Sequence, residues 1–227
     1  MTQAVDLANA IDTFVRGCKT DGTWDAIKAC CIMAAWDGLT GALYPLKGPA
    51  PTNVNFTSSD YNRETGLKGN GSNKYLHSNR NNNDDPQDNK HIAVYGGDCT
   101  NNSIQLSTVT VNTNGDSYLY RTSANATCKI NTQGNNNVSL GSTWSGDSLY
   151  GTSRNSSTTV TSRKDGVSGS HSSTSRSPLD SNLRVFGAAS LLSNARLSFY
   201  SIGEDLDLAL LDARVSTLMT DIGAAIP

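Results

Sequence analysis

The chain contains little charge and no long apolar run. Only 17% of its 227 residues are Asp, Glu, Lys or Arg, and the formal net charge is −2. Nucleic-acid binding depends on clustered positive charge that neutralises phosphates, and this composition gives it no electrostatic support. A membrane-spanning helix needs roughly 20 consecutive apolar residues, and no run in the sequence approaches that length. We therefore expect neither a nucleic-acid partner nor a membrane partner.

The features of an exported, disulfide-stabilised protein are also missing. The N-terminus has no basic region, and Asp6 and Asp12 fall where a signal peptide needs apolar residues. Cysteines are few and odd in number, at five, and Cys30 and Cys31 are adjacent. Their spacing matches no zinc pattern of the C-x-x-C type. We expect reduced thiols in a protein made in a cytosol, with a Cys99–Cys128 disulfide as the alternative.

Glutamate is almost absent, which bears on catalysis. A glycosidase needs two carboxylates that face each other across the sugar, whereas the sequence contains only Glu64 and Glu204, far apart. The three histidines, His77, His91 and His171, are scattered, and no G-x-S-x-G nucleophile motif occurs. We expect no catalytic residues, and hence a protein that is not an enzyme.

Glycine, asparagine, serine and threonine are abundant instead, and from Thr52 onward they separate short apolar or alternating runs. Many short runs with such punctuation are typical of an antiparallel sandwich or barrel. Asn114-Gly115 is the strongest hairpin signal, and the basic, hydroxyl-rich segment 154–176 predicts a solvated loop or hairpin, with an anionic ligand as the alternative. The predicted strands are 74–77, 92–95, 104–111, 117–122, 138–140, 148–150, 157–162, 183–186 and 196–200.

Both ends of the chain have helical patterns. Apolar residues at steps of three and four predict a helix that starts near Thr2 and ends near Gly17. A second helix is expected from a cap at Thr23, with apolar residues 27, 31 and 34 on one face. The proline-marked stretch 45–51 then suggests a domain boundary.

The C-terminal helix has an unbroken apolar stripe. Such a stripe either packs on its own domain or forms a seam between copies, for instance in a trimer. The residues concerned, which we treat as oligomer or docking candidates, are Leu208, Leu211, Val215, Leu218 and Ile222.

Two groups of residues are candidates for ligand binding. Asp84, Asp85 and Asp88 lie in the low-complexity stretch 79–89, which we expect to be a surface loop; they could supply oxygen ligands to calcium, or simply be solvated. Sugar binding needs an exposed aromatic ring together with polar hydrogen-bonding groups. Trp144 and Tyr150, in a turn-rich segment, are the best aromatic candidates, although a tryptophan is more often a core residue.

Two segments carry a resemblance to known domains. The segment GLKGNGSNKYL (66–76) resembles the opening strand pair of laminin-G-like, concanavalin-type domains, and 197–206 resembles their closing strand and acidic helix start. Longer stretches are similar to a group of bacteriophage virion proteins: DGTWDAIKA (21–29), the segment 50–76, SNRNNNDDPQ (78–87) and the ending 195–215.

The resemblance implies a mainly β, concanavalin-like (laminin-G-like) antiparallel jelly-roll sandwich with N-terminal helices and a C-terminal helix. It divides the chain into a helical docking segment (1–50), the sandwich (51–203) and the terminal helix (204–227). It further implies a phage virion structural protein, made in the host cytoplasm and located in the virion. Its expected place is a tail fibre, baseplate appendage or receptor-binding subunit. Expected partners are other virion proteins, host surface glycan and further copies of the chain, with a trimer favoured.

Three other functions remain open. A capsid decoration (head fibre) protein would have the same fold in another place on the virion. A polysaccharide depolymerase would belong to a different class, and a free lectin would bind sugar without a virion. A fold of this kind hosts many functions, so the resemblance alone does not choose among them.

Overall fold

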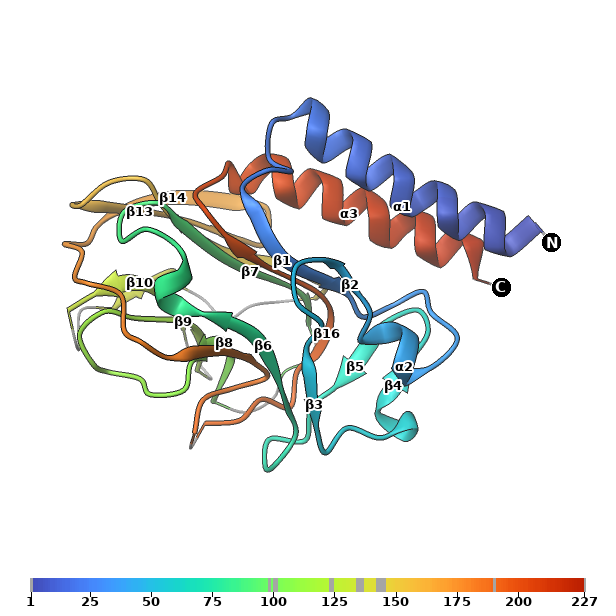
Figure 1. Cartoon of the computed structure of the whole chain (residues 1–227), viewed down its shortest axis with the longest axis horizontal. Coiled ribbons are helices and arrows are strands. Elements are labelled where there is room, and N and C mark those ends of the chain that lie inside the picture. The colour runs from blue at the N-terminus through green and yellow to red at the C-terminus, as the bar shows by residue number, and fades with distance from the viewer. Residues whose placement is uncertain are drawn as a thin grey trace.

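Two antiparallel sheets face each other, and two long helices lie side by side against one of them (Figure 1). The computed structural model describes residues 2–97, 99, 102–122, 125–133, 137–141, 146–189 and 191–226. Side chains from both sheets share one buried cluster, which includes Val94, Leu119, Leu183 and Leu197. The expected mainly β sandwich with a helix at each end is therefore confirmed.

The elements follow one another along the chain in this order. Helix α1 is Thr2–Thr20, β1 Ile27–Ile32, α2 Leu39–Ala42, β2 Pro45–Lys47, β3 Thr52–Val54, β4 Tyr61–Asn62, β5 Gly66–Lys68, β6 Tyr75–Asn81 and β7 Lys90–Gly97. Then come β8 Ser103–Thr108, β9 Asp116–Arg121, β10 Ala126–Thr132, β11 Val138–Ser139, β12 Ser148–Arg154, β13 Thr159–Lys164, β14 Val167–Ser172, β15 Asn182–Val185, β16 Arg196–Gly203 and α3 Leu208–Ala225.

The first sheet is the one that carries the helices. Its strand order within the described residues is β14-β13-β12-β7-β16-β1-β2, with β4 and β5 attached beside β16. Nearly every residue of β16 is buried, because the sandwich core covers one face and the helices cover the other. This two-sided burial explains why apolar residues at 197–202 point to both faces, at Leu197, Phe199, Tyr200 and Ile202. The second sheet has the order β11-β10-β9-β8-β15-β6-β3.

Helices α1 and α3 pack on each other and on the first sheet. The ring of Phe14 on α1 meets the ring of Phe199 on β16 edge to face, with centroids 5.7 Å apart. Arg214 of α3 crosses α1 at Gly17, where a Cβ would lie 2.7 Å from the arginine side chain, and its Nε is 2.7 Å from Asp21 Oδ2. Gly17 thus gives Arg214 room to pass and does not end the helix, which continues to Thr20.

The apolar stripe of α3 is covered by the chain itself. All five candidate residues are buried and belong to the cluster formed with α1 and the first sheet: Leu208, Leu211, Val215, Leu218 and Ile222. The structure therefore favours the core alternative for this stripe over an oligomer seam. The homo-oligomer expected from the sequence stays a prediction, and these five side chains no longer support it.

The second helix expected from Thr23 is wrong. Residues Ile27–Ile32 form β1, which lies between β16 and β2. The sequence IKACCI is buried at five of its six positions, and a short apolar run of that kind does not show whether the period is 2 or 3.6.

The division of the chain into domains at residues 50 and 204 stays a prediction, although the first sheet takes strands from both sides of residue 51.

The nine predicted strands all coincide with observed ones, but their limits and connections differ. Strands β8 and β9 pair as expected, yet residues 109–115 form a longer connection than a two-residue turn. Gly115 is required there because its φ is +76° and a Cβ would lie 1.9 Å from the carbonyl oxygen of Ser177. The segment 154–176 contains the β13–β14 hairpin, in agreement with the hairpin prediction.

The cysteines of the described chain are free, as the sequence predicted. All five cysteines are buried and reduced, and burial raises the pKa of Cys31 and of Cys128 to about 12. No helix in the described part of the chain has the length and apolar character needed to cross a membrane. Where the protein resides is not tested by these features.

Candidate functional site

Two of the three predicted calcium ligands, Asp84 and Asp85, are engaged in other interactions, whereas Asp88 Oδ1 is buried without a hydrogen-bond partner in the described part of the chain. Asp85 is buried and forms ion pairs with Arg80 and with Lys90, whose Nζ lies 3.0 Å from Asp85 Oδ2. Although burial raises the pKa of Asp85, Lys90 and Arg80 together hold that pKa below its ordinary value. Asp84 caps a short 3-10 turn through the backbone N–H of Asn81. Among the described residues, Asp84, Asp85 and Asp88 are not gathered into a group that could hold a metal ion.

The stretch 79–89 is also more ordered than the surface loop expected from its composition. Asn82 is fully buried, and its side-chain amide donates to the carbonyl of Gly115 at 2.9 Å and to Asn131 Oδ1 at 3.0 Å. An asparagine-rich composition indicates polarity, but it does not show that the amide of Asn82 ties this stretch to β9 and β10 of the second sheet.

The predicted sugar-stacking residues do not form a platform. Tyr150 lies in β12 with no exposed surface, and its hydroxyl donates to the carbonyl oxygen of Thr127 at 2.5 Å. The prediction for Tyr150 is wrong because the flanking turn residues suggested an exposed segment, whereas β12 is a central strand that is buried on both faces. Trp144 lies outside the residues that the structure describes.

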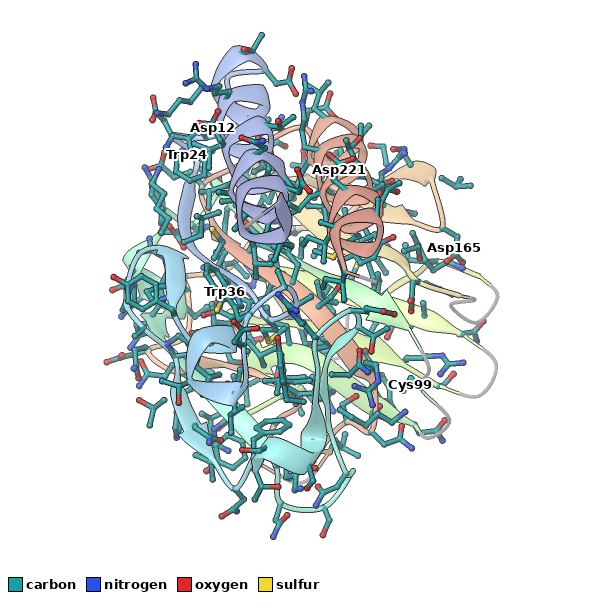
Figure 2. The ribbon with its side chains drawn as sticks, turned by 90° about the vertical axis from the view of Figure 1, so that its right-hand side faces the viewer. Asp12, Trp24, Trp36, Cys99, Asp165 and Asp221 are labelled. Carbon is teal, nitrogen blue, oxygen red and sulfur yellow. The ribbon has the colours of Figure 1, made fainter. Side chains whose placement is uncertain are left out.

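A groove lined mostly by polar residue types, although mainly by their apolar atoms, lies instead between the β13–β14 hairpin and the start of α3. Figure 1 shows these elements side by side, and Figure 2 places Asp165, at the hairpin tip, away from the body of the molecule. The groove has a volume of about 600 Å³. It is lined by Asn155, Thr161, Ser162, Ser168, Gly169, Ser170, Asp205, Leu206, Asp207, Leu208 and Ala209.

The hairpin presents one row of hydroxyl groups to this groove. Thr161 of β13 pairs with Ser170 of β14, and Arg163 pairs with Ser168, so these side chains share one face of the ribbon. Arg163 fixes that face against the helix, because its Nε lies 2.7 Å from Asp212 Oδ2 of α3 and its Nη1 donates to Ser168 Oγ at 3.0 Å. The width of the groove is thereby set by a side-chain bridge.

The opposite wall carries two carboxylates in fixed positions. Asp207 caps α3, with its Oδ1 accepting from the backbone N–H groups of Ala209 at 2.7 Å and Leu210 at 3.3 Å. Asp205 accepts from the hydroxyl of Ser153 at 2.6 Å, while its own N–H donates to Asn89 Oδ1. Each carboxylate keeps a second oxygen that can accept from a ligand.

The groove thus combines hydroxyl donors and acceptors, carboxylate acceptors and an apolar floor at Leu206 and Leu208. Hydroxyl and carboxylate groups can form hydrogen bonds with the hydroxyl groups of a neutral sugar. The described lining contains no aromatic ring, so only the two leucines offer an apolar surface to the C–H face of a sugar. Sequence reasoning missed the groove because its residues are common polar types spread over three segments. The signal available in the sequence was the two-residue spacing of Ser168 and Ser170, which places both on one face of a strand, together with Thr161 on the preceding strand.

A second hollow is mainly apolar. It has a volume of about 570 Å³ and lies between α1 and the segment that follows β1. Trp36 lines it from that segment, and its indole N–H donates to the carbonyl of Ile32 at 2.7 Å. Leu7, Ile11 and Val15 form the α1 side. Figure 2 shows Trp36 below the end of α1.

Comparison with known proteins gives relatives at the level of the fold alone. No protein-family model matches the sequence, and no curated protein matches it. Solved structures of botulinum neurotoxin binding domains do match: serotype D/C VPI 5993 with TM-score 0.59 and 10% identity over 87% of this chain and 52% of that chain, and serotype D with TM-score 0.58 and 11% identity over 85% and 50%.

A structure of botulinum neurotoxin type C, which depends on interaction with two ganglioside molecules to enter cells, has a TM-score of 0.56 and 9% identity, over 87% of this chain and 51% of that chain. The chain therefore spans about half the length of the structures that it matches. These similarities establish that its fold is a mainly β, concanavalin-like sandwich of the kind found in such binding domains.

Proposed function

We propose that this protein is a non-catalytic, lectin-like binding protein whose polar groove between the β13–β14 hairpin and α3 takes a neutral glycan. The observation that carries the proposal is the groove itself, in which the hydroxyls of Thr161, Ser168 and Ser170 face the carboxylates of Asp205 and Asp207. A toxin of similar fold interacts with gangliosides. Because gangliosides are acidic glycolipids, this similarity supports a carbohydrate as the ligand class, whereas the neutral character of the ligand is argued from the groove alone.

The charge of the groove selects the kind of glycan. Its described lining residues include two aspartates and no lysine or arginine, and the nearby Arg163 is held by Asp212. An anionic sugar would meet unfavourable electrostatics, whereas a neutral pyranose can donate its hydroxyl protons to the carboxylates. We therefore expect hexoses or N-acetylated sugars without acid groups as ligands.

A glycan array followed by calorimetry tests this proposal. Ser170→Trp fills the groove and should weaken binding of the best glycan at least tenfold, about 1.4 kcal/mol. Val167→Trp is the matched control, because Val167 is 70% exposed on the same strand, alternates to the other face from Ser168 and Ser170, and does not line the groove. Equal binding by both variants, or binding confined to sialylated glycans, would contradict the proposal.

We further propose that the chain is a phage virion structural protein that presents this binding face on a tail fibre or baseplate appendage, with capsid decoration as the other location. The motifs at 21–29, 50–76 and 195–215 support this part. Immunogold labelling of purified virions with an antibody to the chain tests it. Labelled tails support the appendage, labelled heads support decoration, and unlabelled virions overturn both.

The competing enzyme class is a polysaccharide depolymerase. Both groove aspartates already bond to protein groups, Asp205 to Ser153 and Asp207 to the N-terminus of α3, which supports a binding role for them. A reducing-sugar assay on host envelope polysaccharide separates the classes. Release of reducing ends that stops in Asp205→Asn would make the protein an enzyme.

A further inference from the structure

Asp116 of β9 and Lys129 of β10 form an ion pair that is shielded from solvent. Lys129 Nζ lies 2.5 Å from Asp116 Oδ1, and the exposed fraction of each side chain is 0%. The ring of Tyr118 lies beside the amine, with its centroid 5.4 Å from Nζ. Removing two ions from water costs several kcal/mol for each of them, so this contact is held in place at considerable cost.

The strand register brings the two groups together along a diagonal. Lys129 pairs with Tyr118, whereas Asp116 pairs with Thr132, and the register shifts between these two pairs. Asp116 and Tyr118 are two residues apart on β9, so their side chains share a face. The long lysine side chain therefore runs over that face, past Tyr118, to reach the carboxyl group.

A second buried pair, Asp85 with Lys90, shows how this one differs. There Arg80 adds a second cation, and the pKa of Asp85 stays below its ordinary value. At the other pair, burial raises the pKa of Asp116 above its ordinary value, while burial lowers the pKa of Lys129. Both directions favour a protonated carboxyl next to a neutral amine, which are the forms that can condense.

We propose that the amine of Lys129 and the carboxyl of Asp116 condense into an intramolecular isopeptide bond that joins β9 to β10.

The reaction needs no other reactant. A proton passes from the Lys129 ammonium to Asp116 Oδ1, and the freed Nζ lone pair attacks Cγ. Asp116 Oδ2, which accepts the backbone N–H of Asn112 at 2.7 Å, carries the developing negative charge and becomes the amide oxygen. Oδ1 leaves with its proton and a second proton from Nζ, as water. One C–N bond forms, one C–O bond breaks, and nothing is oxidised or reduced.

The close contact of the two groups and their shielding from solvent both favour the amide. Groups held in reactive contact have effective molarities that reach about 10⁵–10⁸ M. Shielding from bulk solvent also opposes the reverse hydrolysis, and the product replaces two buried ions by one neutral amide, which is less costly to bury. The resulting crosslink would fasten the two strands next to their register shift.

Mass spectrometry of the intact, denatured full-length chain is the first test. The expected result is a mass lower than that of the sequence by one water molecule, in fresh protein or with increasing yield on storage. A mass that equals that of the unmodified sequence at all times overturns the proposal.

A tryptic map then locates the missing water. Trypsin should leave Lys129 uncut and release a branched species in which 91–121 is joined to 122–154. Separate peptides 122–129 and 130–154 are expected only from unlinked chains. Succinimide formation at Asp21-Gly22, Asp37-Gly38 or Asp165-Gly166 also removes one water, but it leaves linear peptides. A deficit that maps to one of these sites overturns the proposal.

Two variants complete the test. Lys129→Arg keeps the positive charge but has no amine that can form this bond, so it should show the full mass. Lys74→Arg is the matched control: Lys74 also lies 2.5 Å from an aspartate, Asp60, but both side chains are partly exposed at 17% and 15%, and the deficit should remain. A deficit that persists in Lys129→Arg overturns the proposal. If that variant fails to fold, the tryptic map of the unaltered chain decides alone.

Discussion

Arg163 of β13 is bonded to Asp212 of α3, with its Nε 2.7 Å from Oδ2, and this bridge joins the strand next to the edge of the first sheet to the helix. The two side chains are largely shielded, with exposed fractions of 17% and 10%. The same guanidinium donates to Ser168 Oγ. One side chain therefore connects the three elements that form the walls of the groove.

Replacing this arginine should loosen the groove and lower stability. We expect Arg163→Gln to reduce the free energy of unfolding by about 1–2 kcal/mol, between the values for exposed and for buried ion pairs, and to weaken glycan binding. Urea unfolding and calorimetry measure the two effects. Arg16→Gln is the control, because the Arg16–Asp12 pair is mostly exposed, and it should change stability by less than about 0.5 kcal/mol. Equal effects of the two variants would show that the Arg163–Asp212 ion pair contributes no more to stability or to glycan binding than an exposed pair does.

The apolar stripe of α3 gives a second prediction. Leu211 is fully buried against α1 and the first sheet, while its neighbour Leu210 is 39% exposed. Leu211→Ala should lower the free energy of unfolding by about 2–5 kcal/mol because it leaves a cavity. Leu210→Ala should cost less than about 1 kcal/mol. Urea unfolding at two protein concentrations measures both.

Light scattering on the same samples addresses the number of copies. The covered stripe predicts that Leu211→Ala leaves the molar mass unchanged before the chain unfolds. A fall in mass without unfolding would return the stripe to the role of a seam between copies.

The sandwich could be predicted from the sequence because its central strands alternate or are continuously apolar between turn residues. The prediction failed at β1, where six mainly apolar residues fit either period, and at β10, a strand inside the second sheet that no predicted strand covers. The polar strand β14, at the end of the first sheet, was expected only as part of a loop or hairpin in 154–176. An edge strand exposed to solvent loses the apolar pattern that marks a strand. Only the three-dimensional arrangement shows that β14 lies beside α3.

The binding site was less predictable for a related reason. Aromatic residues were expected to mark it, yet Tyr150 is buried because β12 lies between β7 and β13. The groove consists of serine, threonine and aspartate residues from the β13–β14 hairpin and the start of α3. No single segment of the sequence contains enough of it to be recognised. The same holds for Asp116 and Lys129, which come together only through the register of β9 and β10.

The thiols should be protected in the folded protein. All five cysteines are buried, and burial raises the pKa of Cys31 and of Cys128 to about 12. Because the thiolate is the reactive form, we expect very slow reaction with a thiol reagent in buffer. In denaturant without reductant, all five should react at once. Finding only three reactive thiols would show a disulfide, and rapid reaction of the native protein would contradict the observed burial.

The last prediction concerns His91, which is fully buried in β7. Its Nδ1 contacts the carbonyl oxygen of Glu204 at 2.5 Å, and its Nε2 contacts Ser201 Oγ at 2.7 Å. Because a carbonyl oxygen only accepts, Nδ1 is the donor in the neutral ring and Nε2 accepts from the serine hydroxyl. Burial lowers the pKa of His91 to about 4, and the carbonyl of Glu204 opposes that shift only in part.

This lowered pKa makes stability depend on pH in a defined direction. The unfolded chain binds a proton at His91 below about pH 6.5, whereas the folded chain does so only near pH 4. The stabilisation is therefore complete above about pH 6.5 and is lost progressively as the pH falls toward 4. Between pH 7 and pH 5 the loss from this one group should be about 2 kcal/mol. Urea unfolding at the two pH values measures it, with His91→Gln as the comparison. The variant should be less stable at pH 7, because it lacks the buried ring contacts, but should lose less stability on acidification. A variant with the same pH dependence as the unaltered chain would assign the effect to other groups.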